Sequence, residues 1–223
     1  MAYSNNFKVI IFDLDNTLVD RQKAAIKLMR DIILDDFPSD RYSNEFREEL
    51  LDLLYQWDYE GHVEKKICFS KYIDRVKIVG RGWQYYNDIW TRCLKDYTEL
   101  FDHSIEVLDY LKQKYRLAMI TNGSVESQQG KLNKINISDY FEKIVISGSY
   151  GIHKPDRRIF QIMLDQLEIE PNEAMYVGDG LGNDVIGAMS VGINPIWVYP
   201  HPNVDSNIAC QRIYKIEDIK ELL

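Results

Sequence analysis

The hydropathy pattern of the chain contains a series of short apolar runs, and several of them end in polar or acidic residues. The first run, in residues 8–18, reads KVIIFDLDNTL, and its β-branched and aromatic residues predict a buried strand. Further apolar runs predict strands over residues 116–121, 142–146, 174–178 and 194–199. Helical patterns lie between or beside these runs, over residues 104–114, 124–134, 156–168 and 183–190. This alternation, with short connections, predicts a parallel sheet with right-handed crossovers.

The alternation of strands and helices is interrupted after Asp20. Residues 21–98 contain no convincing buried strand, and the spacing of Ile26, Met29 and Ile33 fits one face of a helix. Helical patterns cover residues 24–34, 44–54, 63–76 and 83–97. We therefore predict an α/β core, Rossmann-like and doubly wound, formed by residues 1–20 and 99–223, with a helical domain, residues 21–98, inserted into it.

Composition narrows the class of protein. The chain has 223 residues, 45% hydrophobic and 28% charged, which suits an α/β core with a modest insertion. No apolar run approaches the roughly 18 residues of a membrane span, and the N-terminal residues lack a signal-peptide pattern, so we expect a cytoplasmic protein. The net charge of −8 argues against a nucleic acid polymer as partner, but a small phosphorylated molecule needs only a local positive pocket. The three cysteines are widely spaced and indicate neither a disulfide framework nor a zinc site.

Two carboxylates follow the first predicted strand at once. Asp13 and Asp15 stand at its C-terminal end, where open α/β sheets place their ligand crevices, and Asn16 and Thr17 indicate a turn. Carboxylates this close repel each other unless a cation or a shared proton intervenes, so a magnesium site is one hypothesis. The other is that these aspartates merely end a strand and cap the next segment.

Three further segments carry candidate chemistry at the ends of apolar runs. Residues 117–124 read LAMITNGS, and such a turn presents a hydroxyl and free N–H groups to a phosphate oxygen, unless Ser124 is an ordinary helix cap. Lys154 lies in a loop just before a helix opened by Pro155 and Asp156. Residues 174–184 read AMYVGDGLGND, in which two acids can converge on one cation. Its glycine spacing fails the dinucleotide-binding pattern.

Together and in this order, the four segments resemble the haloacid dehalogenase superfamily of phosphohydrolases. The matching motifs are FDLDNTL at 12–18, ITNG at 120–123, HKPD at 153–156 and VGDGLGND at 177–184. The resemblance implies that the Asp13 strand is central in the sheet, flanked by the strands that end at Thr121 and Asp179. It also implies that the helical insertion is a cap over the active site.

The resemblance implies a role for each acid. Asp13 is expected to attack phosphorus and form an aspartyl-phosphate, and Asp15 to give a proton to the leaving alkoxide and later take one from water. The expected cofactor is Mg2+, bound by Asp13, Asp179 and the backbone carbonyl of Asp15. Asp184 is expected outside the direct ligands, where it orients a metal-bound water or pairs with Lys154.

The phosphate oxygens are expected to meet three donors, which are the Thr121 hydroxyl, the Asn122 backbone N–H and the Lys154 ammonium. The second aspartate, Asp15, favours a phosphatase or a phosphomutase over a dehalogenase. A phosphomutase of the same family stays open as an alternative, and so does a catalytically idle member that acts as an interaction protein. A receiver-type signalling domain is disfavoured, because it needs neither the long helical insertion nor two aspartates on its first strand.

The expected substrate is a small phosphate ester, either a nucleoside monophosphate or a sugar phosphate. The motifs look most like the branch of nucleoside 5′-monophosphatases and acylneuraminate 9-phosphatases, with phosphoglycolate phosphatases close behind. We expect no membrane partner, and a monomer or homodimer. The insertion is rich in aromatic residues, which either pack its core or stack on a substrate. These residues are Trp57, Tyr59, Trp83, Tyr85, Tyr86 and Trp90.

Overall fold

The computed structural model of the chain describes residues 7–61, 63–200 and 208–223, and it divides into two compact units. One unit consists of Met1–Asp20 and Leu100–Leu223, and the other of Arg21–Glu99. Glu99 thus belongs to the helical unit, one residue beyond the expected boundary. The Glu99 carboxylate lies 2.5 Å from Lys23 Nζ and 2.6 Å from Lys27 Nζ, both of the helical unit.

The first unit is built on a six-stranded parallel sheet with the strand order β3-β2-β1-β4-β5-β6. The first strand is central, and its Phe12 pairs with Met119 of β2 on one side and with Val177 of β4 on the other. The predicted α/β fold and strand order are confirmed, while β6, a strand of three residues, was not predicted. The strands are β1 (Val9–Phe12), β2 (Arg116–Thr121), β3 (Lys143–Ile146), β4 (Ala174–Gly178), β5 (Asn194–Val198) and β6 (Gln211–Ile213).

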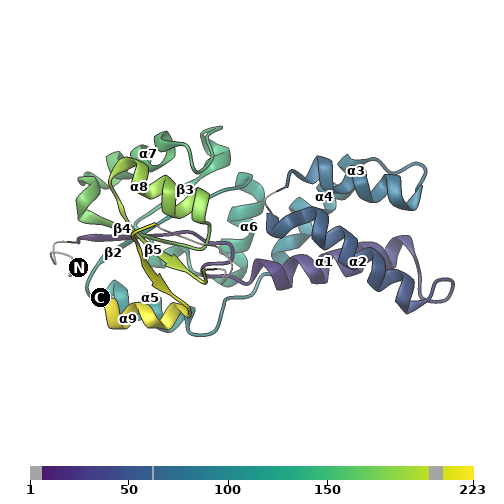
Figure 1. The fold of residues 1–223 in the computed structure, drawn as a ribbon, viewed down its shortest axis with the longest axis horizontal. Helices are drawn as coiled ribbons and strands as arrows, with labels where there is room; N and C mark the ends of the chain where they lie inside the picture. Colours follow the sequence, from purple (N-terminus) through teal and green to yellow (C-terminus); the bar gives the residue numbers. More distant parts are fainter. Residues whose placement is uncertain (1–6, 62, 201–207) are drawn as a thin grey trace. The chain divides into compact units, whose positions relative to one another are not determined.

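Helices cover both faces of this sheet, so the unit has three layers (Figure 1). Alternate residues of β1 explain the layering, since Ile10 and Phe12 join the apolar cluster that includes α5, whereas Val9 and Ile11 join the cluster that includes α7. The helices of the unit are α5 (Ser104–Lys112), α6 (Val125–Ile135), α7 (Arg157–Leu167), α8 (Gly187–Val191) and α9 (Ile219–Leu222). No helix in the described part of the chain is long and apolar enough to cross a membrane.

Local chemistry explains where the helices near the strand ends begin. The Ser124 hydroxyl accepts a hydrogen bond from Ser127 N, and the Asp156 carboxylate accepts one from Arg158 N, so both residues are helix caps. The helix expected over residues 183–190 is replaced by a π-helical turn, Leu181–Ile186, followed by α8. The turn is wide because the Gly180 carbonyl accepts hydrogen bonds from both Asp184 N and Val185 N.

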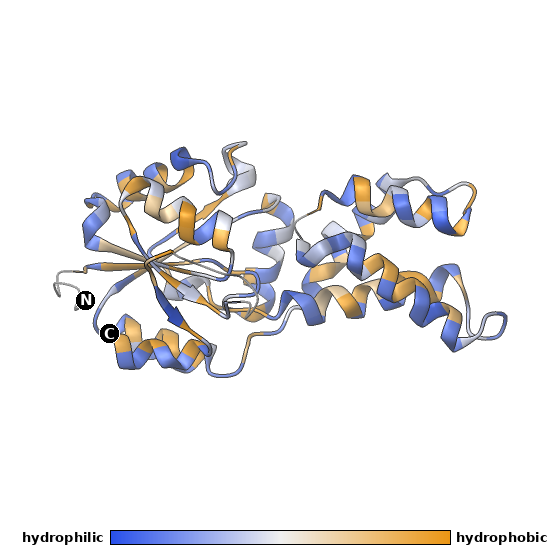
Figure 2. Cartoon of the chain, viewed as in Figure 1, coloured by the Kyte–Doolittle hydropathy of each residue, from blue (hydrophilic) through white to orange (hydrophobic). Residues whose placement is uncertain are grey.

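In its described residues, the second unit has four α-helices and two short 3-10 helices around an apolar core of its own. Figure 2 shows hydrophobic residues along these helices, and the rings of Tyr86 and Trp90 are buried among them. Tyr59, by contrast, is 66% exposed. A buried carboxylate, Asp58, pairs with Arg21 at 2.9 Å and also with Lys65. The helices are α1 (Arg21–Asp36), α2 (Asn44–Asp58), α3 (Lys65–Val76) and α4 (Trp83–Cys93).

Candidate active site

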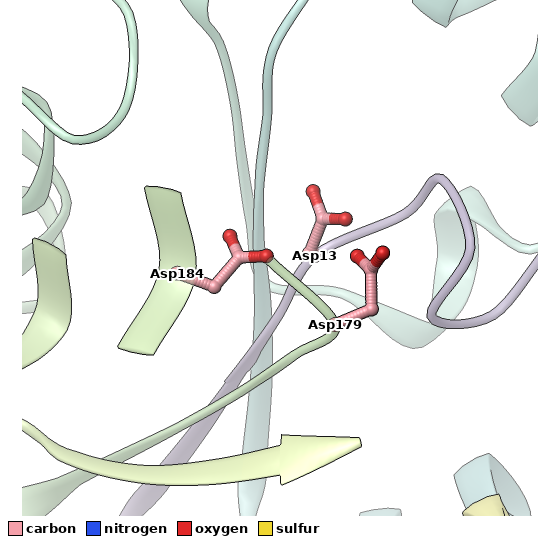
Figure 3. Close-up of side chains that lie close together, drawn as sticks. All are labelled: Asp13, Asp179 and Asp184. Carbon is pink, nitrogen blue, oxygen red and sulfur yellow. The ribbon is translucent and has the colours of Figure 1, made fainter. Parts of the chain in front are cut away.

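The ends of three neighbouring strands bring the candidate residues together. Asp13 directly follows β1, Thr121 is the last residue of β2, and Asp179 directly follows β4. Because the three strands are parallel and adjacent, these residues lie at the same edge of the sheet, where open α/β sheets bind ligands. Asp13, Asp179 and Asp184 lie close together in Figure 3, and each offers an oxygen within 4.8 Å of the others.

A buried lysine joins two of these acids. Lys154 Nζ lies 2.6 Å from Asp13 Oδ1, 2.6 Å from Asp184 Oδ1 and 2.9 Å from the Tyr176 hydroxyl oxygen. Asp13, Lys154 and Asp184 are each at most 6% exposed. The other oxygen of Asp184 accepts a hydrogen bond from Gly180 N at 2.8 Å. Asp184 is therefore held by the chain through both of its oxygens.

The charges of this cluster change the acidity of its members. Burial raises the pKa of Asp13 to about 7, the Lys154 ammonium opposes that rise, and the Asp184 carboxylate adds to it. Burial, followed by the nearby Asp184 and Asp13, holds the pKa of Asp179 well above its usual range. Burial alone would lower the pKa of Lys154, but Asp13 and Asp184 outweigh that effect and raise it well above its ordinary value. The lysine is therefore a fixed positive charge.

The donor set of this cluster fits a magnesium ion. Mg2+ prefers carboxylate oxygens and needs few of them from the protein, since it keeps several waters. A divalent cation also favours the ionised form of buried acids, which is the form that burial disfavours here. Asp184 is held through both oxygens by contacts of 2.6 and 2.8 Å. The Thr17 hydroxyl oxygen, by contrast, lies 3.5 Å from Asp13 Oδ2 and 3.4 Å from Asp179 Oδ1. Asp13 and Asp179 are therefore better suited as direct ligands than Asp184.

The structure separates Asp15 from the cluster around Lys154. The chain turns at Asn16, which has a left-handed φ of 60°, and Asn16 N donates to Val19 O at 2.8 Å. Beyond the turn, the Asp15 carboxylate meets a second lysine, since Lys131 Nζ lies 2.7 Å from each of its oxygens. Gln128 Nε2 also donates to Asp15 Oδ2 at 3.1 Å. The two neighbouring aspartates thus have different cationic partners.

The expected phosphate donors lie at the end of β2 and in the loop of Lys154. Thr121 is fully buried, and its hydroxyl accepts a hydrogen bond from Gln128 Nε2. The side chain of Asn122 makes two hydrogen bonds to the Lys154 backbone, because Oδ1 accepts from Lys154 N at 2.9 Å and Nδ2 donates to Lys154 O at 3.0 Å. Asn122 therefore fixes the loop that carries Lys154, a contact that its expected role did not include.

Four polar residues of the site were missed by the sequence reasoning. Thr17 is fully buried, and its hydroxyl accepts from Asp179 N at 3.1 Å and lies 3.4 Å from Asp179 Oδ1, so it links the first and last motifs. Tyr176 lies within β4 and resembles an ordinary core residue, while Gln128 and Lys131 resemble surface residues of a helix. The one signal available in the sequence was the place of Thr17 inside the FDLDNTL motif.

Comparison with known proteins places this chain in a family. A profile of the haloacid dehalogenase-like hydrolases matches residues 10–198. The chain is 31% identical to glyceraldehyde 3-phosphate phosphatase from Pyrococcus abyssi over 196 residues, which cover 85% of this chain and 80% of that protein. It is 24% identical to mouse (Mus musculus) N-acylneuraminate-9-phosphatase over 244 residues, with 96% of this chain and 92% of that protein covered.

Solved structures have the same fold. HAD-hydrolase YfnB from Bacillus subtilis, in a magnesium-bound crystal structure, superposes with a TM-score of 0.79 at 20% identity, covering 98% of this chain and 99% of that one. The fold is thus that of a HAD-like hydrolase. The chain belongs to the haloacid dehalogenase-like hydrolase family, as the sequence predicted, and its predicted enzyme class, a HAD-like phosphatase, is confirmed.

Proposed function

We propose that the chain is a magnesium-dependent phosphatase that hydrolyses a small phosphorylated metabolite through an aspartyl-phosphate on Asp13. The observation that carries the proposal is the contact of 2.6 Å between Lys154 Nζ and Asp13 Oδ1, at a strand end where Asp179 and Asp184 also converge. The substrate is a nucleoside monophosphate or a sugar phosphate. The phosphatases of glyceraldehyde 3-phosphate and N-acylneuraminate 9-phosphate among the relatives favour the sugar phosphate.

In the proposed reaction, Asp13 acts as the nucleophile. One of its oxygens attacks phosphorus in line, a P–O bond forms to Asp13, and the ester P–O bond breaks with its electron pair on the leaving oxygen. Asp15 gives that oxygen a proton, so the alcohol leaves neutral. In the second step water attacks phosphorus, the bond to Asp13 breaks, and Asp15 takes a proton from the water. Asp15 ends each cycle in the protonation state in which it began.

The chain supplies positive charge and hydrogen-bond donors for the phosphoryl group. The Lys154 ammonium, the Thr121 hydroxyl and the Asn122 backbone N–H stabilise the charge that develops on its oxygens. Asp13, Asp179 and the backbone carbonyl of Asp15 would hold magnesium, and Asp184 would support Lys154 and a metal-bound water. When bound, the ion supplies charge that favours the ionised carboxylates and a phosphate oxygen.

The proposal extends to the partners and location of the protein. The ligand is a small phosphate ester, and neither a nucleic acid polymer nor a membrane is a partner, since the net charge of −8 disfavours anionic surfaces. The protein works in the cytoplasm as a monomer or homodimer. The helical unit, Arg21–Glu99, is proposed as the cap that selects the substrate.

The test is the release of phosphate from 4-nitrophenyl phosphate and from a panel of nucleotides, triose phosphates and sugar phosphates, with magnesium or with a chelator. We expect magnesium-dependent release that Asp13→Asn abolishes and that Asp102→Asn, at an exposed position of the same unit, leaves unchanged. Release that persists in Asp13→Asn would refute the nucleophile. Interconversion of sugar phosphates without release would identify the phosphomutase alternative, and no turnover would favour the interaction protein.

A further inference from the structure

Helix α6 carries two buried polar side chains toward the site. Gln128 is 1% exposed and Lys131 is 3% exposed, and both contact the Asp15 carboxylate. They are three residues apart on the helix, which places them on the same face. Lysine is almost never buried to this degree without an anionic partner, so the position of Lys131 depends on Asp15.

Gln128 also links two segments of the site, one carrying Asp15, the proposed proton donor, and the other carrying Thr121, a proposed phosphate-binding residue. Its amide nitrogen donates to Asp15 Oδ2 and to the Thr121 hydroxyl, and so it joins the turn after β1 to the end of β2. The turn at Gly123 leaves room for this side chain, since a Cβ at Gly123 would lie 2.9 Å from Gln128 Cγ. Gly123 also has a φ of 145°, which side chains rarely allow. The missing side chain and the backbone conformation of Gly123 thus leave space for the Gln128 side chain.

The two aspartates of the first motif consequently have one lysine each. Lys154 contacts Asp13 Oδ1, and Lys131 contacts both oxygens of Asp15. The contact to both oxygens fixes the plane of the Asp15 carboxylate as well as its position. Orientation matters for a proton donor, because a proton moves efficiently only when donor and acceptor are within hydrogen-bond reach.

We propose that Lys131 and Gln128 are positioning residues that hold the Asp15 carboxylate and the Thr121 hydroxyl in place for the departure of the alcohol. This inference rests on the proposed phosphatase function. Neither side chain is assigned a contact with substrate. Both act through the groups that they hold.

If the inference holds, substituting Lys131 or Gln128 lowers kcat/KM more for some leaving groups than for others. An alkyl phosphate releases an alkoxide that needs a proton, whereas 4-nitrophenyl phosphate releases a stabilised phenolate that does not. The ratio of kcat/KM for a sugar phosphate to kcat/KM for 4-nitrophenyl phosphate therefore reports the proton transfer. The value of kcat/KM depends only on the steps up to and including the first irreversible one. The later hydrolysis of the aspartyl-phosphate therefore does not affect it.

The experiment measures this ratio in the full-length chain with magnesium, for Lys131→Met and Gln128→Leu. Each has a matched control on the exposed face of α6, Lys134→Met and Gln129→Leu. Positioned acid catalysis contributes about 100-fold or more, so we expect Lys131→Met to lower the ratio by about 30- to 100-fold. Gln128→Leu should lower it by about 10-fold, and both controls should leave it unchanged.

Rescue separates positioning from a structural role. Lys131→Arg keeps a cation that can contact both oxygens of Asp15, so it should recover most of the ratio lost in Lys131→Met. Equal losses of kcat/KM for both kinds of ester, or no loss, would overturn the inference while leaving the phosphatase function intact. An unmodified chain that releases phosphate from no ester would instead refute the proposed function.

A structural measurement tests the positioning without turnover. Crystal structures of the unmodified chain and of Lys131→Met should show the Asp15 carboxylate rotated or displaced in the variant, with Asp13 and Lys154 unmoved. An Asp15 carboxylate that keeps its place without Lys131 would overturn the inference, whatever the activity of the chain.

Discussion

Raising the pH from about 4 to about 7 without magnesium should destabilise the folded chain through Asp13. Burial raises the pKa of this carboxyl from its ordinary value of 3.8 to about 7, so between these values the folded chain holds a proton that the unfolded chain has lost. The stabilisation is complete below about pH 3.8 and is lost as the pH rises through about 7. A rise of about three pKa units, at about 1.4 kcal/mol each, gives a loss of about 4 kcal/mol.

Urea unfolding followed by circular dichroism, in chelator between pH 4 and pH 8, measures this loss. Other groups also titrate, so the informative quantity is the unfolding free energy of Asp13→Asn minus that of the unmodified chain. This difference should grow by about 4 kcal/mol from pH 4 to pH 8. Magnesium at about 100 times its dissociation constant should return about 2.7 kcal/mol to the unmodified chain at pH 7. A difference that stays flat with pH would refute the assignment of the raised pKa to Asp13.

Two further substitutions test packing and charge, each against a control in the same unit. A Cβ at Gly178 would lie 2.5 Å from Asp184 Cγ. Gly178→Ala should therefore lower the free energy of unfolding by about 1 to 3 kcal/mol and also lower magnesium-dependent activity. The control Gly182→Ala, with open space around its Cβ, should change neither. Arg21→Met leaves the fully buried Asp58 short of one cation and should cost about 3 to 5 kcal/mol by urea unfolding. The control Arg30→Met removes an exposed pair from the same helix and should cost less than about 1 kcal/mol, and equal effects would contradict this argument.

Much of the fold followed from the alternation of apolar runs and helical patterns. The strand ends at Thr121 and Gly178 were predicted correctly, because each is a buried run stopped by polar or glycine residues. The π-helical turn at Leu181–Ile186 was not, since it depends on how the Gly180 carbonyl is shared between two N–H groups. Strand β6 has three residues and carries too short a pattern to be distinguished from a loop.

The site residues that stand at strand ends could be predicted from the sequence. Those that reach the site from inside a strand or from a helix could not. Asp13, Thr121 and Asp179 follow from topology, because the C-terminal ends of adjacent parallel strands meet at one edge. Tyr176 reaches Lys154 from inside a strand, and Lys131 reaches Asp15 from a helix. The polar contacts of these side chains depend on three-dimensional neighbours, which hydropathy periodicity does not record.

The charges of the site argue for a divalent cation. Four carboxylates, those of Asp13, Asp15, Asp179 and Asp184, stand at the strand ends, and two buried lysines pair with three of them. When Asp13 attacks, Asp179 and Asp184 are also ionised while Asp15 holds the proton for the leaving oxygen, so three negative and two positive charges leave a charge of −1. A buried charge of this size is costly unless a cation compensates it, and a phosphate ester adds further negative charge on binding. A divalent ion compensates this charge and part of the charge of the ester, whereas a monovalent ion leaves the charge of the ester uncompensated and keeps Asp13 closer to its protonated, unreactive form.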